Sequence, residues 1–202
     1  MSYYIRILGT SDPDIHVDHL IDALKAHGLH AKFALPENET GNKWTFLDIN
    51  NASGEELAQV ERNATEEGEL GYDELEEFKE EILECKPASA VQWLENFFEK
   101  VKVVYAFQLL SAAFEESNYE IIDTIRTAIW NKTGGILQAD GEGFSNEDGY
   151  HILWQFSENV SGDWYCSVID EKGQWQNFCM DLGDPEQRKE FLQGKVPAKA
   201  IR

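Results

Sequence analysis

The apolar residues in the first part of the chain predict a strand and then a helix. Residues 3–8 are predicted to form the strand, and four apolar residues at helical spacing predict the helix: Val17, Leu20, Ile21 and Leu24. The segment 11–14, Ser-Asp-Pro-Asp, predicts the start of this helix, because Ser and Asp cap helices and Pro suits a first turn. Residues 29–35 and 44–49 follow as strands, so the chain opens with a β-α-β-β unit.

Residues 56–62, ELAQVER, fit two structures. Their apolar spacing suits one helical turn, and their place after the turn-forming NNASG suits the returning arm of a hairpin. We favour the strand.

The middle of the chain has helical periodicity. From Asp73 one face is apolar and the other is filled with Asp and Glu; the apolar face holds Leu75, Phe78, Ile82 and Leu83. A second helix after Pro87 is apolar over a wide face, at Ala90, Trp93, Leu94, Phe97, Phe98 and Val101. The run 101–110 is apolar at successive positions, as in a central strand, with a continued helix as the alternative. Ser117 and Glu120 form a capping box for a third helix, which Gly134 and Gly135 end.

The last third predicts short strands separated by Gly, Asn and Asp turns, at residues 136–139, 150–156, 164–169 and 175–180. Asp184, Pro185 and Gln187 then predict a capped final helix that ends near Gly194. The fold class is therefore α+β: an N-terminal β-α-β-β unit, central helices, and a C-terminal antiparallel β-meander with a closing helix. We predict one compact domain over residues 1–202, with halves 1–112 and 113–202 as the alternative division.

Charge narrows the classes of partner. The chain has 38 Asp and Glu against 17 Lys and Arg, a formal net charge of -21, which repels nucleic acid and anionic membranes. The same field attracts a basic protein, or it serves solubility alone. The N-terminal sequence has no basic segment followed by an apolar run, and we expect a cytoplasmic protein. No sequence feature indicates an oligomeric state.

The acidic surplus is concentrated between Glu55 and Glu84, where 13 acidic and two basic residues give a net charge of -11. Such a run is either a docking surface for a cationic partner or the solvated face of a helix next to an acidic loop. On the first interpretation the partner-binding residues are Glu66, Glu67, Glu69, Asp73, Glu76, Glu77 and Glu80.

The segment 134–149, GGILQADGEGFSNEDG, is the alternative site. Its carboxylates at Asp140, Glu142 and Asp148, with neighbouring His151 and Trp154, would serve a small-ligand site or a hydrolase. Asp and Asn oxygens also suit calcium, but Phe144 and Ser145 stand where an EF-hand has a ligand and Gly. A tight turn between strands explains the same glycines and acids.

Other candidate chemistry is sparse. His16 and His19 lie three apart, without the Cys or HExxH partners of a zinc site. Cys85, Cys166 and Cys179 have no disulfide or zinc spacing, although folding could bring His151 close to Cys166 or Cys179. Trp154, Trp164 and Trp175 fit either a core or an aromatic surface.

These patterns favour a non-enzymatic protein without metal or cofactor, since nucleotide, nucleophile-elbow and metalloprotease motifs do not occur. In composition the chain resembles small, acidic bacterial cytosolic proteins, among which toxin-neutralising immunity proteins are common. The leading hypothesis is an interaction or inhibitor module of the immunity type that engages a basic partner.

Overall fold

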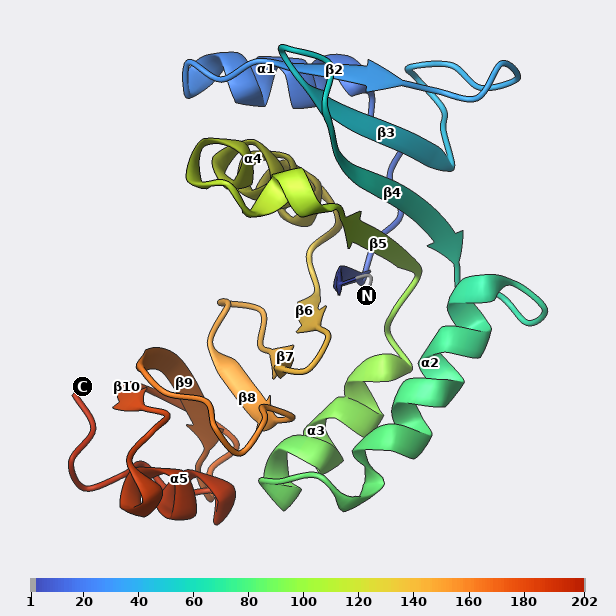
Figure 1. Cartoon of the computed structure of the whole chain (residues 1–202). Coiled ribbons are helices and arrows are strands. Elements are labelled where there is room, and N and C mark those ends of the chain that lie inside the picture. Colours follow the sequence, from blue (N-terminus) through green and yellow to red (C-terminus); the bar gives the residue numbers. More distant parts are fainter. Residues whose placement is uncertain (1–2, 202) are drawn as a thin grey trace. The chain divides into compact units, whose positions relative to one another are not determined.

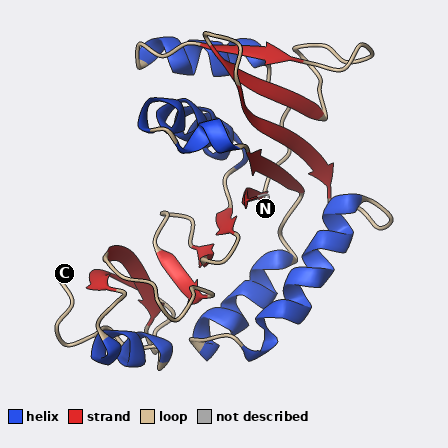
Figure 2. Ribbon diagram, in the orientation of Figure 1, coloured by secondary structure: helices blue, strands red, loops and turns tan. Residues whose placement is uncertain are grey.

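The computed structural model describes residues 3–201 and confirms the α+β class. These residues form five α-helices, two short 3-10 helices and ten strands, with a strand meander and a closing helix at the C-terminal end (Figures 1 and 2). The chain divides into two compact units. Unit 1 comprises the residues up to Tyr72 and Val101–Gly135, and unit 2 comprises Asp73–Lys100 and the residues from Ile136 onward. A single domain over the whole chain stays a prediction.

Unit 1 contains a five-stranded antiparallel sheet in the order β1-β5-β4-β3-β2. Its elements are β1 (Tyr3–Gly9), α1 (Val17–Ala26), β2 (Ala31–Ala34), β3 (Phe46–Asn51), β4 (Glu56–Ala64), β5 (Val103–Leu109), the 3-10 helix η2 (Ser111–Phe114) and α4 (Glu116–Thr133). Helices α1 and α4 pack against each other, and α4 also contacts β1 and β4. The β-α-β-β opening is thus present, with β2 shorter than its predicted range.

The sequence interpretation of β4 and β5 is confirmed. Residues 56–62 belong to strand β4, which pairs with β3 on one side and with β5 on the other. Strand β5 lies between β1 and β4 and is buried at every position except Gln108. A strand that is flanked and covered on both faces has no polar face, and this is why residues 101–110 lack alternation.

The predicted start of the first helix is wrong. Residues 11–16 are not helical, and α1 begins at Val17 with His16 as an N-cap that makes no side-chain bond. The capping residues are used elsewhere: Asp12 accepts two hydrogen bonds from the Arg62 guanidinium, at 2.9 and 2.6 Å, and the Ser11 hydroxyl donates to the Thr133 carbonyl at 2.9 Å. Long-range contacts therefore override a local cap signal.

The predicted capping box of α4 is also wrong. The helix begins at Glu116, so Ser117 already lies inside it, and the N-cap residue Glu115 makes no side-chain cap bond. Asn118 instead donates from Nδ2 to the Ala112 carbonyl of the preceding 3-10 turn at 3.0 Å. The other end agrees with the prediction, because Gly134 follows the helix at a φ of 65°, a conformation that suits glycine.

Unit 2 contains helices packed with the C-terminal strands. Its elements are α2 (Leu70–Glu81, whose first turn belongs to unit 1), the 3-10 helix η1 (Ile82–Glu84), α3 (Ala88–Phe98), β6 (Ile136–Ala139), β7 (Gly143–Ser145), β8 (His151–Trp154), β9 (Asp163–Ile169), β10 (Trp175–Asp181) and α5 (Pro185–Leu192). Neighbouring strands pair in chain order, antiparallel except for β8 and β9, which are parallel. The cap of α5 is confirmed, since Asp184 accepts from the backbone N–H groups of Glu186 and Gln187.

Strand β7 lies inside the segment that the sequence interpretation left as a loop. It is three residues long and contains Gly143, whose φ is 122°. A Cβ at Gly143 would lie 2.1 Å from the Leu153 carbonyl oxygen, so close pairing with β8 requires glycine. A strand this short, with glycine at its start, has too few residues to show a period.

Aromatic side chains form much of the core of unit 2. Phe144 of β7 packs against Phe78 of α2 and Phe98 of α3, with ring centroids 5.4 and 5.7 Å apart. A second group lies between the last strands and α5, where buried Phe191 packs near Phe178 at 6.3 Å. These contacts fix the inner faces of α2 and α5 and leave their other faces exposed.

Candidate functional site

Helix α2 presents an acidic face to solvent. Asp73, Glu77, Glu80 and Glu84 are all exposed and follow one another at spacings of four, three and four, so they share one side of the helix and its 3-10 extension. We call these four residues the acidic stripe. Leu75, Phe78 and Ile82 are buried on the opposite side. Burial of the apolar side therefore fixes which way the carboxylates point.

The acidic stripe is not neutralised within the described chain. None of its four carboxylates has a hydrogen-bond or ion-pair partner among residues 3–201. Lys79 is the one cation of α2, and its Nζ lies 2.7 Å from Glu76 Oε1 and 3.1 Å from Glu99 Oε1. The hydrogen bond to Glu76 is the main cause of the raised pKa of Lys79. This lysine is engaged beside the stripe and does not offset it.

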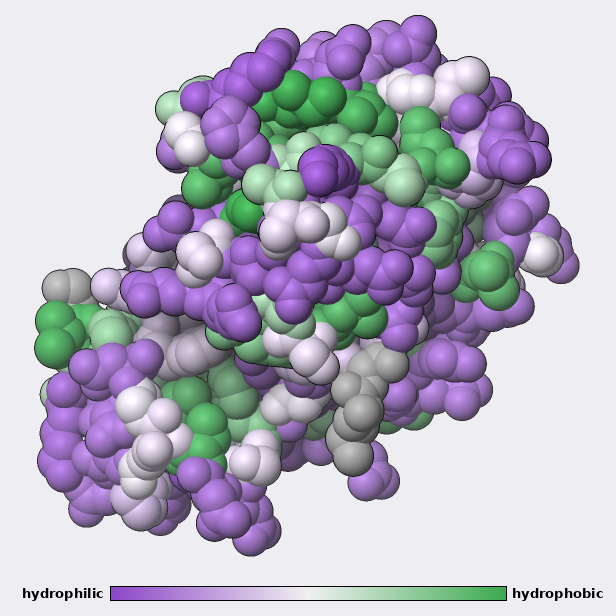
Figure 3. Space-filling model, turned by 45° about the horizontal axis from the view of Figure 1, so that its top comes forward, coloured by the Kyte–Doolittle hydropathy of each residue, from purple (hydrophilic) through white to green (hydrophobic). Residues whose placement is uncertain are grey.

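Apolar side chains are exposed along the same segment. Leu83 is 63% exposed and lies three residues from Glu80, next to Glu84. The sequence interpretation placed Leu83 on the inner face; this is wrong, because residues 82–84 form a 3-10 turn that rotates successive side chains further than an α-helix does. On the face drawn in Figure 3, hydrophilic residues dominate and apolar residues emerge between them in separate groups.

The other acidic residues proposed for partner binding lie close by in sequence. Glu66, Glu67 and Glu69 are exposed in the turn that precedes α2, and they belong to unit 1. Glu76 is half-buried and is bound to Lys79. Glu76 thus differs from the stripe residues in having a partner.

The alternative site, the Asp140–Asp148 loop, is organised by Asn146. This residue is fully buried, and its Oδ1 accepts from the backbone N–H groups of Asp148 at 3.1 Å and Tyr150 at 2.9 Å. Asp148 is exposed, and Asp140 and Glu142 are half-buried. The Asn146 bonds give this turn a structural explanation, and sequence reasoning considered Asn146 only as a cation ligand.

His151 and Trp154, the other residues of the alternative site, face the interior of unit 2 to different degrees. His151 is 2% exposed, and desolvation lowers its pKa to about 3 despite a hydrogen bond with the Leu153 backbone. Trp154 is half-buried; its Nε1 donates to the Phe156 carbonyl at 3.2 Å, and the Arg188 guanidinium lies 5.0 Å from its ring centroid. His151 is therefore uncharged at neutral pH and enclosed by protein.

His151 and Cys166 are register partners on the parallel strands β8 and β9, as the sequence analysis considered. Cys166 is fully buried, and burial raises the pKa of its thiol well above the usual range. Nucleophilic catalysis needs the thiolate, which a nearby imidazolium would stabilise. Here both groups are held in their neutral forms, so the pair packs in the core.

The remaining candidates show no common site. The rings of His16 and His19 stack with centroids 5.4 Å apart, and within residues 3–201 no three His, Cys, Asp or Glu side chains converge as metal ligands would. Trp164 is 38% exposed, whereas Trp154 and Trp175 are half-buried. In the same range, no helix combines the length and the apolar character needed to span a bilayer.

Comparison of the chain with protein family models, with curated proteins and with solved structures finds no match. Functional inference therefore depends on the geometry of the chain itself.

Proposed function

We propose that the protein is an interaction module and that the acidic stripe binds a lysine- and arginine-rich surface of a partner protein. The observation that supports this is the run of four exposed carboxylates on one side of α2 and η1, each without a described partner. Complementary charge accelerates encounter and disfavours partners of the wrong charge.

The arrangement is unfavourable for the isolated helix. Asp73 with Glu77, and Glu80 with Glu84, are like-charged pairs at a spacing of four, and each such pair destabilises a helix by about 0.2–0.5 kcal/mol. Glu80 and Glu84 also lie at the C-terminal end of the helical segment, where the helix dipole favours cations. Lysine or arginine side chains of a partner, bound at the stripe, would offset both the repulsion between the carboxylates and their unfavourable interaction with the helix dipole. The relief of these two effects would contribute to the free energy of binding.

Leu83 supplies the apolar component of the proposed interface. Protein interfaces combine a small apolar centre with a polar rim, and the exposed Leu83 stands beside Glu80 and Glu84. The proposed partner surface is therefore cationic with an apolar contact point. A surface that is cationic alone would use the carboxylates and leave Leu83 in water.

An inhibitor of the immunity type is the specific form of this proposal. Such a protein acts by covering the basic surface with which its target binds a polyanionic substrate. The predicted exclusion of nucleic acid as a direct ligand agrees with this role, because the inhibitor itself must present negative charge. The proposal assigns no catalytic step to this chain and does not use the Asp140–Asp148 loop.

A direct binding measurement tests the proposal. The probe is a fluorescent amphipathic peptide with lysine and arginine around a leucine centre, titrated with the protein at low and high ionic strength. The test variant carries Glu77→Gln, Glu80→Gln and Glu84→Gln; the matched control carries Glu116→Gln, Glu120→Gln and Glu171→Gln, which remove the same charge from exposed positions elsewhere.

We expect the stripe variant to bind the peptide weaker by on the order of tenfold, whereas the control retains most of the affinity and high salt weakens every complex. The unsubstituted protein, the stripe variant and the control variant can each be immobilised and incubated with a cell lysate. A partner that depends on the stripe should be lost from the stripe variant alone, whereas proteins attracted by net charge should be lost equally from both variants. Equal losses in the two variants would show that net charge alone attracts the peptide, and the proposal would then be wrong.

A further inference from the structure

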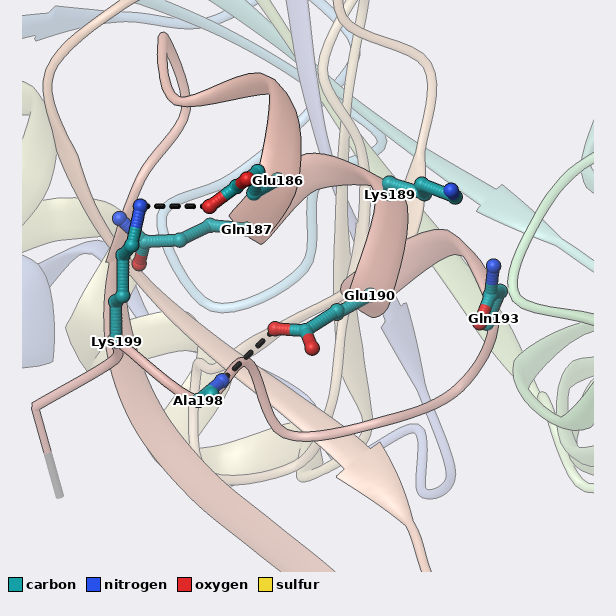
Figure 4. A pocket seen from close by; sticks show the side chains of 7 residues that line it. All are labelled: Glu186, Gln187, Lys189, Glu190, Gln193, Ala198 and Lys199. Atoms are coloured by element: carbon teal, nitrogen blue, oxygen red, sulfur yellow. Dashed lines mark hydrogen bonds and ion pairs between the residues drawn. The ribbon is translucent and has the colours of Figure 1, made fainter.

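The C-terminal segment of unit 2 returns to α5, and the two border an open polar pocket of about 420 Å³ (Figure 4). Glu186, Gln187, Lys189, Glu190 and Gln193 line it from α5 and its C-cap, and Ala198 and Lys199 line it from the returning segment. The backbones of Ile201 and Cys179 exchange two hydrogen bonds of 2.8 and 2.9 Å, which fasten this segment to β10. The pocket wall is thereby held in place.

Gln187 places an unsatisfied acceptor in this wall. The residue is 8% exposed, and its Oε1 is buried with no hydrogen-bond partner among the described residues. Its Nε2 donates to Asp184 Oδ2 at 3.3 Å, and this bond fixes the orientation of the amide, because a reversed amide would place two acceptor oxygens together. A buried carbonyl without a donor is unfavourable, and a ligand N–H or O–H that reached this oxygen would supply the missing hydrogen bond.

Charged and polar groups lie on both sides of Glu190 in this pocket. Figure 4 shows Gln187 and Lys199 on one side of Glu190, with Lys189 and Gln193 on the other side. Glu190 Oε2 accepts from the Ala198 N–H at 2.8 Å, and its second oxygen has no described partner. Lys199 is engaged, with Nζ 2.7 Å from Glu186 Oε2 and 3.7 Å from Asp184 Oδ2, whereas Lys189 has no partner among residues 3–201.

We propose that this pocket binds a small zwitterion of the amino-acid or dipeptide class. The ligand ammonium group would donate to Gln187 Oε1 and to the second carboxylate oxygen of Glu190. The ligand carboxylate would accept from the Lys189 ammonium group and the Gln193 amide nitrogen. The two glutamates and two lysines of the lining carry no net charge together, which suits a ligand with both signs better than a simple cation or anion.

The proposal is tested with the full chain and three related probes: the dipeptide Ala-Ala, its N-acetylated form and its C-amidated form. Binding is followed by amide NMR shifts at residues 186–199 and by titration calorimetry. We expect Ala-Ala to bind and each blocked dipeptide to bind weaker by roughly tenfold or more, since each lacks one charged end. No shift at these residues with millimolar Ala-Ala, or equal binding of the blocked forms, would overturn the proposal.

Two substitutions locate the site. Gln187→Met removes the unsatisfied oxygen at similar volume, and Glu190→Gln removes the charge while keeping an acceptor for the Ala198 N–H. Each should weaken Ala-Ala binding by on the order of tenfold, whereas Glu158→Gln, at an exposed position outside the lining, should leave it unchanged. Unchanged binding by both pocket variants would contradict the assignment. Basic-peptide binding by the acidic stripe should survive in all three, which separates this test from that of the proposed function.

Discussion

Ionisable side chains are buried in one region of unit 2 and exposed in another. Around His151 and Cys166 the protein encloses groups that could carry charge, and burial keeps both neutral. Along the acidic stripe four carboxylates are exposed and have no partner among residues 3–201. The interior pair could resemble a catalytic dyad by residue type alone, yet its environment suppresses the charge that catalysis would use. The contrast favours a function carried by surface charge.

Carboxylates with a structural role differ again from those of the stripe. Asp184 caps α5, and Asp170 accepts from the backbone N–H groups of Lys172 and Gln174 in the β9–β10 turn at 2.8 and 2.9 Å. Hydrogen bonds to these carboxylates lower the pKa of Asp170 and of Asp184. The acidic surplus therefore includes residues that hold turns and caps together, whereas the four carboxylates of the stripe make no such bond among residues 3–201.

The largest expected effect on stability is that of a substitution in the buried region around His151. Phe191 is fully buried and packs near His151, Trp154 and Phe178. Phe191→Ala should lower the free energy of unfolding by about 3–5 kcal/mol through lost burial and the cavity left behind. Urea denaturation measures the change, with Glu77→Ala as the exposed counterpart, which should change stability by about 0.5 kcal/mol or less. Similar losses for the two variants would remove the distinction between the regions.

The second expected effect is a pH dependence of the free energy of unfolding, caused by His151. Its pKa is about 3 in the folded protein and about 6.5 when unfolded, so between these values the unfolded chain binds more protons and stability falls as pH decreases. From pH 7 to pH 5 this group alone should remove about 2 kcal/mol from the free energy of unfolding. In His151→Phe that component should be absent. Denaturation of both proteins at the two pH values measures it, and parallel pH profiles would show that His151 accepts a proton without unfolding.

The smallest expected effect on stability is that of substitutions in the acidic stripe. Glu77→Gln and Glu80→Gln should each stabilise the protein at low salt by about 0.2–0.5 kcal/mol for every like-charged neighbour that they separate. High salt should abolish the gain, because exposed charges are screened. Thermal denaturation at both ionic strengths measures this, and Glu171→Gln, outside the stripe, serves as the control. A loss of stability in the stripe variants would indicate that these carboxylates have partners.

Sequence reasoning located the acidic segment but not its details. The spacing of Leu75, Phe78 and Ile82 was enough to predict which side of α2 is buried, and so which carboxylates point outward. The exposure of Leu83 was missed, since a 3-10 turn leaves no sequence period of its own. The polar pocket at α5 was also missed, because its wall comes from residues whose position depends on pairing between Ile201 and Cys179.

By itself, the sequence determined the properties that depend on neighbours along the chain: the α+β class, the cap at Asp184 and the concentration of acidic residues between Glu55 and Glu84. It favoured a strand over residues 56–62 without excluding a helix, and the structure confirms the strand. Tertiary structure decided the role of residues whose local preference differs from the contacts they make with residues distant in sequence. Asp12 pairs with Arg62 instead of capping a helix, and burial beside β9 holds His151 neutral. Local propensities contribute a fraction of a kilocalorie to about one kilocalorie per residue, and a bidentate ion pair or the desolvation of a charge can exceed this.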